Sequence, residues 1–278
     1  MCAAMALFIA NDAIVKMVSG SLPGMQLIFL RGLMASLLML VVCAVNGVFK
    51  ADAATGHSPL RQLLNRTVVL RAALDATASN IYLTALFHMP LANATAINMA
   101  TPLFITLMAV HRFGETVNRT RWLAIGAGFV GVLLIVQPAA EGFNAWALLC
   151  LLGTVLHAAR DLLTRLVPPS MSSLLITLTT VTAVTALSGG ISLFQGWAPF
   201  SVLQWLQLSG ASVMLSGGYF LLIRAMRRGE MNVIAPFRYS GLLFALLLGW
   251  LIWGEIPNTL ALAGIGLLLG AGLYMVKR

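Results

Sequence analysis

The stretch FGETVN at residues 113–118 returns as WGEIPN at residues 253–258, 140 positions further along the chain. Each copy lies between two long apolar runs, so that residues 94–137 and 234–277 share one layout. Leucine and isoleucine matches between two apolar segments arise from composition alone, whereas a Gly-Glu-x-x-Asn break at the same place in both does not. We interpret the stretches as parts of an internal duplication, since self-similarity at a fixed period is the signature of repeated units.

The composition places the chain in a membrane. Of its 278 residues, 60% are hydrophobic and only 9% are charged, with a mean hydropathy of +0.94. A soluble domain carries about 25% charged residues, so this chain cannot cover a surface that faces water. Its apolar runs are about 17–25 residues long, which suits helices that cross a bilayer. The sequence therefore predicts an all-α, polytopic membrane protein with ten transmembrane helices, at about residues 2–20, 25–46, 67–87, 91–110, 120–137, 144–165, 171–194, 203–224, 232–252 and 258–276.

Nearly all Lys and Arg residues between the runs lie in alternate loops, which face the same side of the membrane. Because Lys and Arg accumulate in cytoplasmic loops, we expect a multi-pass protein of the cytoplasmic membrane with both termini in the cytoplasm. The same loops account for the formal charge of +9, so nucleic-acid binding is not indicated. The residues that carry this bias are Lys50, Arg61, Arg66, Arg112, Arg119, Arg121, Arg165, Arg227, Arg228, Lys277 and Arg278.

Each half of the chain contains five runs, and an odd number turns the second half upside down relative to the first. Residues 1–138 and 143–278 are therefore expected to form two inverted repeats, an arrangement typical of secondary transporters. Two prolines, Pro102 and Pro236, lie inside runs and are expected to kink them. The first run contains polar and charged residues, which argues against a cleavable signal peptide.

These features resemble the drug/metabolite transporter superfamily. Ten helices in two inverted units, a proline in the fourth helix and Gly-Glu after the fourth and ninth helices are similar to the EamA-type exporters, and most like the YddG-type aromatic amino-acid exporters. The resemblance covers essentially the whole chain, although the counterpart of Pro102 is Leu242. It implies a central cavity lined by helices one, three, four, six, eight and nine, with helices five and ten outside the transport path.

Small residues indicate how the fifth and tenth helices pack. Gly131 follows Ala127 at a spacing of four, and Gly266 and Gly270 have the same spacing in the tenth run. Such stripes allow helix backbones to approach closely in lipid. We expect these two helices to pack against each other.

Charged groups at membrane depth face protein or a water-filled cavity. With a rise of 1.5 Å per residue, Asp12 and Arg31 reach a similar depth near one surface, and Asp75 and Arg238 near the other. We expect these two cross-helix pairs. Within-helix pairs such as Asp12–Lys16 are an alternative, and direct substrate contact is another. The candidates for structural or gating ion pairs are Asp12, Lys16, Arg31, Asp75, Arg160, Asp161 and Arg165.

Each membrane carboxylate also has a cation one turn away in sequence: Lys16 for Asp12, Arg71 for Asp75 and Arg165 for Asp161. A group that carries a coupling proton needs the opposite environment, buried without a cation. This pattern favours facilitated rather than proton-coupled transport.

Neutral polar and aromatic side chains on inward faces are candidates for the substrate cavity. Such groups suit a zwitterion with an aromatic side chain, because they offer donors, acceptors and an apolar wall. Ordinary hydrogen bonding between helices is the alternative for each. The candidates are Asn11, Ser79, Tyr82, Thr95, Asn98, His157, Tyr219, Arg238 and Tyr239.

We therefore predict a carrier, functional as a monomer, that exports small metabolites by alternating access. Amino acids, aromatic and other neutral ones, are the expected substrates, and a multidrug or nucleotide-sugar carrier is the alternative. No His cluster, Gly-rich phosphate loop or Cys pair indicates an enzyme, a cofactor or a metal. The cysteines, Cys2, Cys43 and Cys150, form no disulfide pattern.

Overall fold

The computed structural model describes residues 1–49, 63, 65–113, 119–137, 145–168, 171–228 and 235–276, and these contain helices and no strand. The first Gly-Glu break, the junction between the predicted halves and four charged loop residues, Lys50, Arg61, Lys277 and Arg278, lie outside these ranges. The helices follow the apolar runs closely. They are α1 (Cys2–Ser19), α2 (Gly24–Val45), α4 (Arg66–Leu86), α5 (Leu91–Asn98), α6 (Thr101–Phe113), α7 (Arg119–Val136), α8 (Trp146–Thr164), α9 (Ser173–Gln195), α10 (Val202–Arg228), the 3-10 helix η1 (Ala235–Tyr239), α12 (Ser240–Trp253) and α13 (Thr259–Val276).

The helices are long and apolar enough for a membrane. Within the described residues, six helical stretches qualify on length and hydropathy, and three shorter ones, Trp122–Val136, Phe237–Trp253 and Thr259–Tyr274, are also apolar. The remaining long helix, α4, carries Arg71 and Asp75 in its interior. The all-α, polytopic fold class predicted from the sequence is confirmed.

Both proline-containing runs are interrupted, as expected. The fourth run divides into α5 and α6, and Pro102 occupies the first turn of α6, where its missing N–H costs least. Thr101 closes the break by donating its hydroxyl to the carbonyl of Asn98 at 2.5 Å. In the ninth run, Pro236 lies in η1, and a regular α-helix begins only at Ser240.

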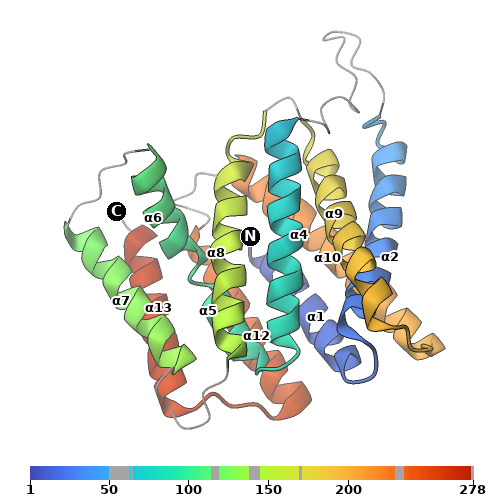
Figure 1. The fold of residues 1–278 in the computed structure, drawn as a ribbon. Coiled ribbons are helices and arrows are strands. Elements are labelled where there is room, and N and C mark those ends of the chain that lie inside the picture. The colour runs from blue at the N-terminus through green and yellow to red at the C-terminus, as the bar shows by residue number, and fades with distance from the viewer. Residues whose placement is uncertain are drawn as a thin grey trace.

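The helices pack in pairs that join the two predicted halves (Figure 1). The main pairs are α2 with α9, α7 with α13, α4 with α8, and α1 with α10. Two further pairs, α1 with α12 and α6 with α8, lie around the centre. Each helix of the first half has a counterpart at the same place in the second half: α1 and α8, α2 and α9, α4 and α10, α6 and α12, and α7 and α13. When each helix is exchanged for its counterpart, the set of pairs stays the same.

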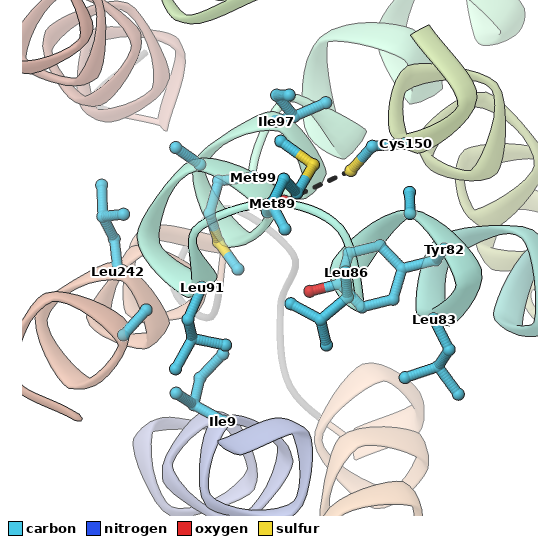
Figure 2. Packing of buried hydrophobic residues seen from close by; sticks show 14 of the residues in the cluster. Ile9, Tyr82, Leu83, Leu86, Met89, Leu91, Ile97, Met99, Cys150 and Leu242 are labelled. Carbon is cyan, nitrogen blue, oxygen red and sulfur yellow. Dashed lines mark hydrogen bonds between the residues drawn. The ribbon is translucent and has the colours of Figure 1, made fainter. Parts of the chain in front are cut away.

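The apolar core surrounds α5. Figure 2 shows Leu91, Ile97 and Met99 of this segment in contact with side chains from α1, α4, α8 and α12. Cys150 of α8 is fully buried there and donates its thiol to the carbonyl of Ala94 at 3.6 Å. The short helix α5 is thus fixed on several sides, next to the break at Met99 and Ala100.

The crossing of α7 and α13 depends on two glycines. A Cβ on Gly131 would lie 2.7 Å from the carbonyl oxygen of Gly264, and a Cβ on Gly264 would lie 2.6 Å from that of Gly131. The expected contact between these helices is present, but the prediction for Gly266 and Gly270 was wrong. Both are exposed and have no atom within 4 Å of an added Cβ. The stripe that faces α7 is displaced by two residues from the one inferred from spacing.

Replacing Gly131 by Leu should force the two backbones apart and lower the free energy of unfolding by about 3 kcal/mol or more. Thermal unfolding of the purified protein in detergent measures the change. Gly126→Leu is the matched control on the same helix, because Gly126 is exposed and has open space around it. Equal destabilisation by both substitutions would contradict a backbone contact at Gly131.

Candidate functional site

A cavity of about 100 Å³ lies at the centre of the bundle. It has room for several water molecules, since one water needs about 10–15 Å³ measured in this way. Its wall comes from the six helices that the family resemblance implies, and also from α2 through Arg31 and Gly32 and from α9 through Val181 and Val184. Methionine, leucine and phenylalanine side chains complete the apolar part.

Eight of the nine substrate-cavity candidates line this cavity: Asn11, Ser79, Tyr82, Thr95, Asn98, His157, Tyr219 and Arg238. Tyr239 does not. It is buried with its hydroxyl beside Gly272 of α13, and no hydrogen-bond partner for the hydroxyl is present in the part of the chain that the structure describes. Tyr239 follows Arg238 directly in the chain, so the two side chains point in different directions, and only the arginine points into the cavity.

One group of polar residues is centred on Asp12 of α1. Asn11 donates to Asp12 Oδ1 at 2.9 Å, and the Tyr82 hydroxyl donates to Asp12 Oδ2 at 3.1 Å. Arg31 donates through Nη1 to Asn11 Oδ1 at 3.2 Å. The predicted pair of Asp12 and Arg31 is therefore not a direct contact: the Asn11 amide lies between the two charges.

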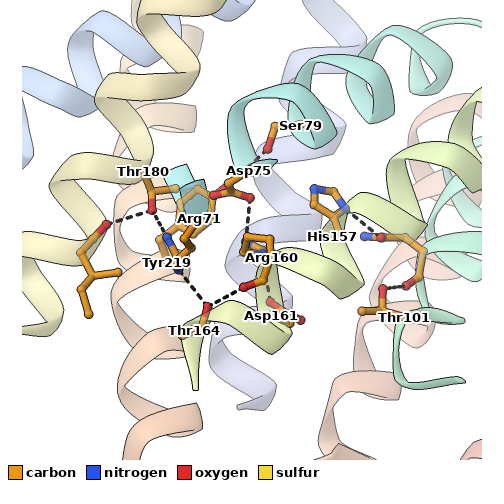
Figure 3. Close-up of polar contacts among 12 residues, drawn as sticks. Arg71, Asp75, Ser79, Thr101, His157, Arg160, Asp161, Thr164, Thr180 and Tyr219 are labelled. Carbon is orange, nitrogen blue, oxygen red and sulfur yellow. Dashed lines mark hydrogen bonds and ion pairs between the residues drawn. The ribbon is translucent and has the colours of Figure 1, made fainter. Parts of the chain in front are cut away.

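A second group forms a chain of ion pairs between α4, α8 and η1, shown in part in Figure 3. Arg160 contacts Asp75 at 2.8 Å and Asp161 at 2.9 Å, and Asp161 contacts Arg238 at 2.7 Å. We call these four residues the ion-pair chain. The predicted pair of Asp75 and Arg238 is thus wrong: Arg160 occupies the position beside Asp75, and Arg238 is paired with Asp161.

Arg71 makes contacts that were not predicted from the sequence. Its side chain is fully buried and donates to Thr164 of α8 at 2.8 Å and to Thr180 of α9 at 2.5 Å (Figure 3). It thereby joins three helices near one end of the bundle. A charged residue in the interior of an apolar run was the available signal, but Arg71 was considered only as the cation one turn from Asp75. Arg165, by contrast, is exposed, and no ion pair joins it to Asp161 in the described part of the chain.

Aromatic and amide groups form the rest of the polar wall. His157 Nδ1 lies 3.1 Å from Asn98 Oδ1, at the end of α5, and its ring is 5.8 Å from that of Tyr82. Tyr219 contacts Ser79 through its hydroxyl at 3.4 Å and packs edge-on against Phe8 at 5.1 Å between ring centroids. These residues provide an amphipathic surface with both donors and acceptors.

Lys16 makes an unexpected contact at the end of α1. Its ammonium group lies 2.7 Å from Glu255 Oε1, donates to the Met89 carbonyl at 2.9 Å and lies 4.7 Å from the Trp253 ring centroid. Glu255 Oε2 also accepts the backbone N–H of Leu91 at 3.0 Å. We call the contact of Lys16 with Glu255 the latch. It replaces the within-helix pair of Lys16 with Asp12 that was considered from the sequence.

The latch explains the second Gly-Glu-x-x-Asn break. Gly254 has φ of 65° and ends α12, with its N–H and that of Glu255 bonded back to the carbonyls of Trp250 and Gly249. Asn258 begins α13 by accepting the N–H of Ala261 at 2.8 Å. Between these two caps, Glu255 is turned toward α1 and α5. The motif therefore stops one helix, starts the next and places a carboxylate.

Comparison with known proteins identifies the family. The sequence pattern of the EamA-like transporter family matches residues 1–137 and 144–277, nearly the whole chain. This chain belongs to the EamA-like transporter family. A riboflavin transporter of Rhizobium johnstonii is 32% identical over 80% of this chain and 71% of its own length. The protein is therefore a membrane transporter.

Other relatives agree with this assignment, and one solved structure shares the fold. The pseudopaline exporter CntI of Pseudomonas aeruginosa is 26% identical over 92% of this chain and 87% of its own. An S-adenosylmethionine uptake transporter of Rickettsia bellii is 26% identical over 96% and 88%. One crystal structure shares the fold with a TM-score of 0.66 at 16% identity, covering 98% of this chain and 93% of that one. These relatives are not aromatic amino-acid exporters specifically.

The buried charges of this transporter do not cancel. Four arginines, Arg31, Arg71, Arg160 and Arg238, and three aspartates, Asp12, Asp75 and Asp161, are buried in the described residues. With every group ionised, four positive and three negative charges leave one positive charge. In a region of low dielectric, such an excess attracts a ligand that carries a negative group.

A double-mutant cycle should detect the pairing of Arg238. Asp161→Asn and Arg238→Gln should show a coupling energy above about 1 kcal/mol, because each substitution removes the same contact. Asp75→Asn and Arg238→Gln share no direct contact and should show a smaller coupling. Thermal unfolding of the three single variants, the two double variants and the wild type measures both. A larger coupling for Asp75 would contradict the described ion-pair chain.

Proposed function

We propose that this transporter carries amino acids, aromatic and other neutral ones, or metabolites that contain an amino-acid group, through the central cavity by alternating access. The observation that carries the proposal is the cavity itself. It lies between the two halves of the chain and combines buried carboxylate and guanidinium groups with Phe8, Tyr82 and Tyr219. Such a wall suits a small zwitterion that also has an apolar or aromatic part.

The relatives support a small polar substrate but differ in what they carry. By name, one transports riboflavin, one exports pseudopaline and one takes up S-adenosylmethionine. Of these compounds, S-adenosylmethionine contains an α-amino carboxylate, which links its transporter to our proposal. None of the three names favours a multidrug or nucleotide-sugar carrier. Export is the direction that we propose, and the names include both directions.

Alternating access requires a closure on each side of the cavity, and the described contacts provide one candidate on each side. Lys16 lies one turn beyond Asp12 in α1, toward the end of the bundle where α5 begins. Asp161 lies one turn beyond His157 in α8, toward the opposite end. The latch and the ion-pair chain therefore lie on opposite sides of the cavity. If the loops rich in Lys and Arg lie in the cytoplasm, the latch lies at the external side of the membrane.

Reconstitution in liposomes tests the substrate class. Vesicles loaded with unlabelled L-phenylalanine should accumulate labelled L-phenylalanine by counterflow, since a carrier exchanges substrate across the membrane. External L-tryptophan, L-methionine and S-adenosylmethionine should compete, whereas riboflavin and a lipophilic cation should not. Counterflow of riboflavin without any competition by amino acids would overturn the proposed substrate class. Empty liposomes and liposomes with heat-denatured protein are the controls.

Opening at the latch should be necessary for transport. In a Cys2→Ser background, Lys16→Cys and Glu255→Cys joined by a short, reducible thiol cross-linker should abolish counterflow, and reduction should restore it. The remaining cysteines, Cys43 and Cys150, are buried. Flux is measured before cross-linking, after it and after reduction.

A second pair at the same end of the bundle is the matched control. Gln137 and Asn258 are exposed and hydrogen-bonded at 2.9 Å, and they join α7 to α13. Because these helices do not line the cavity, adding the cross-linker to the Gln137→Cys, Asn258→Cys variant should leave the flux of that variant the same as before cross-linking. Normal flux in the cross-linked latch variant would refute its role as a gate.

A further inference from the structure

The three buried aspartates do not have the same surroundings. Asp75 contacts Arg160, and Asp161 contacts both Arg160 and Arg238. Asp12 is only 8% exposed, and in the described residues no Lys, Arg or His nitrogen lies within 4.0 Å of it. Among the buried aspartates of the described residues, Asp12 is the one without an ion pair, and it lines the cavity.

Asp12 is held in place and still has acceptor capacity. Each carboxylate oxygen accepts one hydrogen bond from a neutral donor, Asn11 for Oδ1 and Tyr82 for Oδ2. An ionised carboxylate has about four lone-pair sites, so each oxygen can accept another donor. These two hydrogen bonds orient the group but do not compensate its charge. A cationic ligand group would do so.

Arg31 complements Asp12 in the same cavity. Its side chain is 2% exposed, and its Nη1 donates to Asn11, while its Nε has no hydrogen-bond partner among the described residues. A buried guanidinium with an unsatisfied donor is costly unless an acceptor reaches it. In the part of the chain that the structure describes, no carboxylate makes an ion pair with Arg31.

Asn11 shows which chemistry fits between the two charges. Its amide presents an oxygen acceptor to Arg31 and an N–H donor to Asp12. An α-amino carboxylate presents the same order with full charges: a carboxylate acceptor next to an ammonium donor. Charge-assisted hydrogen bonds are about twice as strong as neutral ones, so such a ligand would bind the two side chains more strongly than the amide does.

We propose that Arg31 and Asp12 form a subsite for an α-amino carboxylate, in which Arg31 binds the carboxylate and Asp12 binds the ammonium group. The inference rests on the proposed function and specifies which part of the ligand is recognised. The remainder of the ligand extends along the wall formed by Phe8, Tyr82 and Tyr219. The side chain of the substrate is then bound by apolar contact, and its identity matters less than the head group.

Three small ligands separate the two halves of the subsite. L-Phenylalanine has both charges, 3-phenylpropanoate lacks the ammonium group, and 2-phenylethylamine lacks the carboxylate. Apparent Kd values come from the ligand-dependent rise in unfolding temperature of the full-length protein in detergent. We expect the wild type to bind L-phenylalanine at least about tenfold more tightly than either analogue, since each loses a hydrogen bond to a charged group.

Two variants assign the charges to residues. Asp12→Asn should weaken L-phenylalanine about tenfold and remove its advantage over 3-phenylpropanoate, while the advantage over 2-phenylethylamine remains. Arg31→Gln should also weaken L-phenylalanine about tenfold, but it should remove the advantage over 2-phenylethylamine and keep the advantage over 3-phenylpropanoate. Arg71→Gln is the matched control, because it removes a buried charge that does not line the cavity, and it should leave the ranking of the three ligands unchanged.

The outcomes distinguish this inference from the proposed function. If the wild type carries L-phenylalanine but binds both analogues equally well, the subsite is wrong and the proposed function stands. The same holds if Asp12→Asn weakens all three ligands by one factor, which is the pattern of a structural role. If amino acids neither exchange nor bind, the proposed function fails, and the subsite with it. The wild-type ranking decides even if a variant does not fold.

Discussion

The structure depends on the need to compensate charge inside a membrane. Three aspartates and four arginines are buried in the described residues, and bilayer hydrocarbon cannot solvate their charges. They therefore gather on the inner sides of the helices, and their contacts decide how α1, α2, α4, α8 and η1 face one another. The cavity lies where this compensation is incomplete. The same constraint that organises the bundle thus also produces the central cavity.

Two kinds of backbone interruption position these groups. The break between α5 and α6 places Asn98 next to His157, and η1 places Arg238 next to Asp161. Gly254 and Asn258 perform a related task at the end of the bundle, where they hold Glu255 against Lys16. Proline and glycine, which lower helical stability, are used here at points where a regular helix would point the polar side chain elsewhere.

The sequence was sufficient to predict the helices and most residues of the cavity wall. It was not sufficient to predict which charged side chains pair with one another. Hydropathy marks the helices because they must span hydrocarbon, and polar residues at membrane depth must turn inward, so most cavity candidates were identifiable. Depth along the membrane, however, says nothing about direction around a helix axis. Asp75 and Asp161 are both buried around Arg160, and only the packing of α4, α8 and η1 assigns Arg238 to Asp161.

The contacts of Lys16 and of the glycines were missed for similar reasons. Glu255 is 239 residues from Lys16 in the chain, and α13 has glycines on more than one face. Sequence spacing identified Gly266 and Gly270, whereas the close approach uses Gly264. The spacing of a motif describes the surface of one helix, whereas the register of a helix crossing depends on both helices.

The division of the fourth span has a mechanical consequence. The regular hydrogen-bond ladder is interrupted at Met99 and Ala100, where Ala100 bonds to Ile97 and Leu103 bonds to Ala100 in tighter turns. The span is consequently stiff on each side of this point and compliant at it. Since α5 is fixed in the core and α6 packs mainly against α8, a rotation at this break would move α6 without disturbing the core contacts of α5.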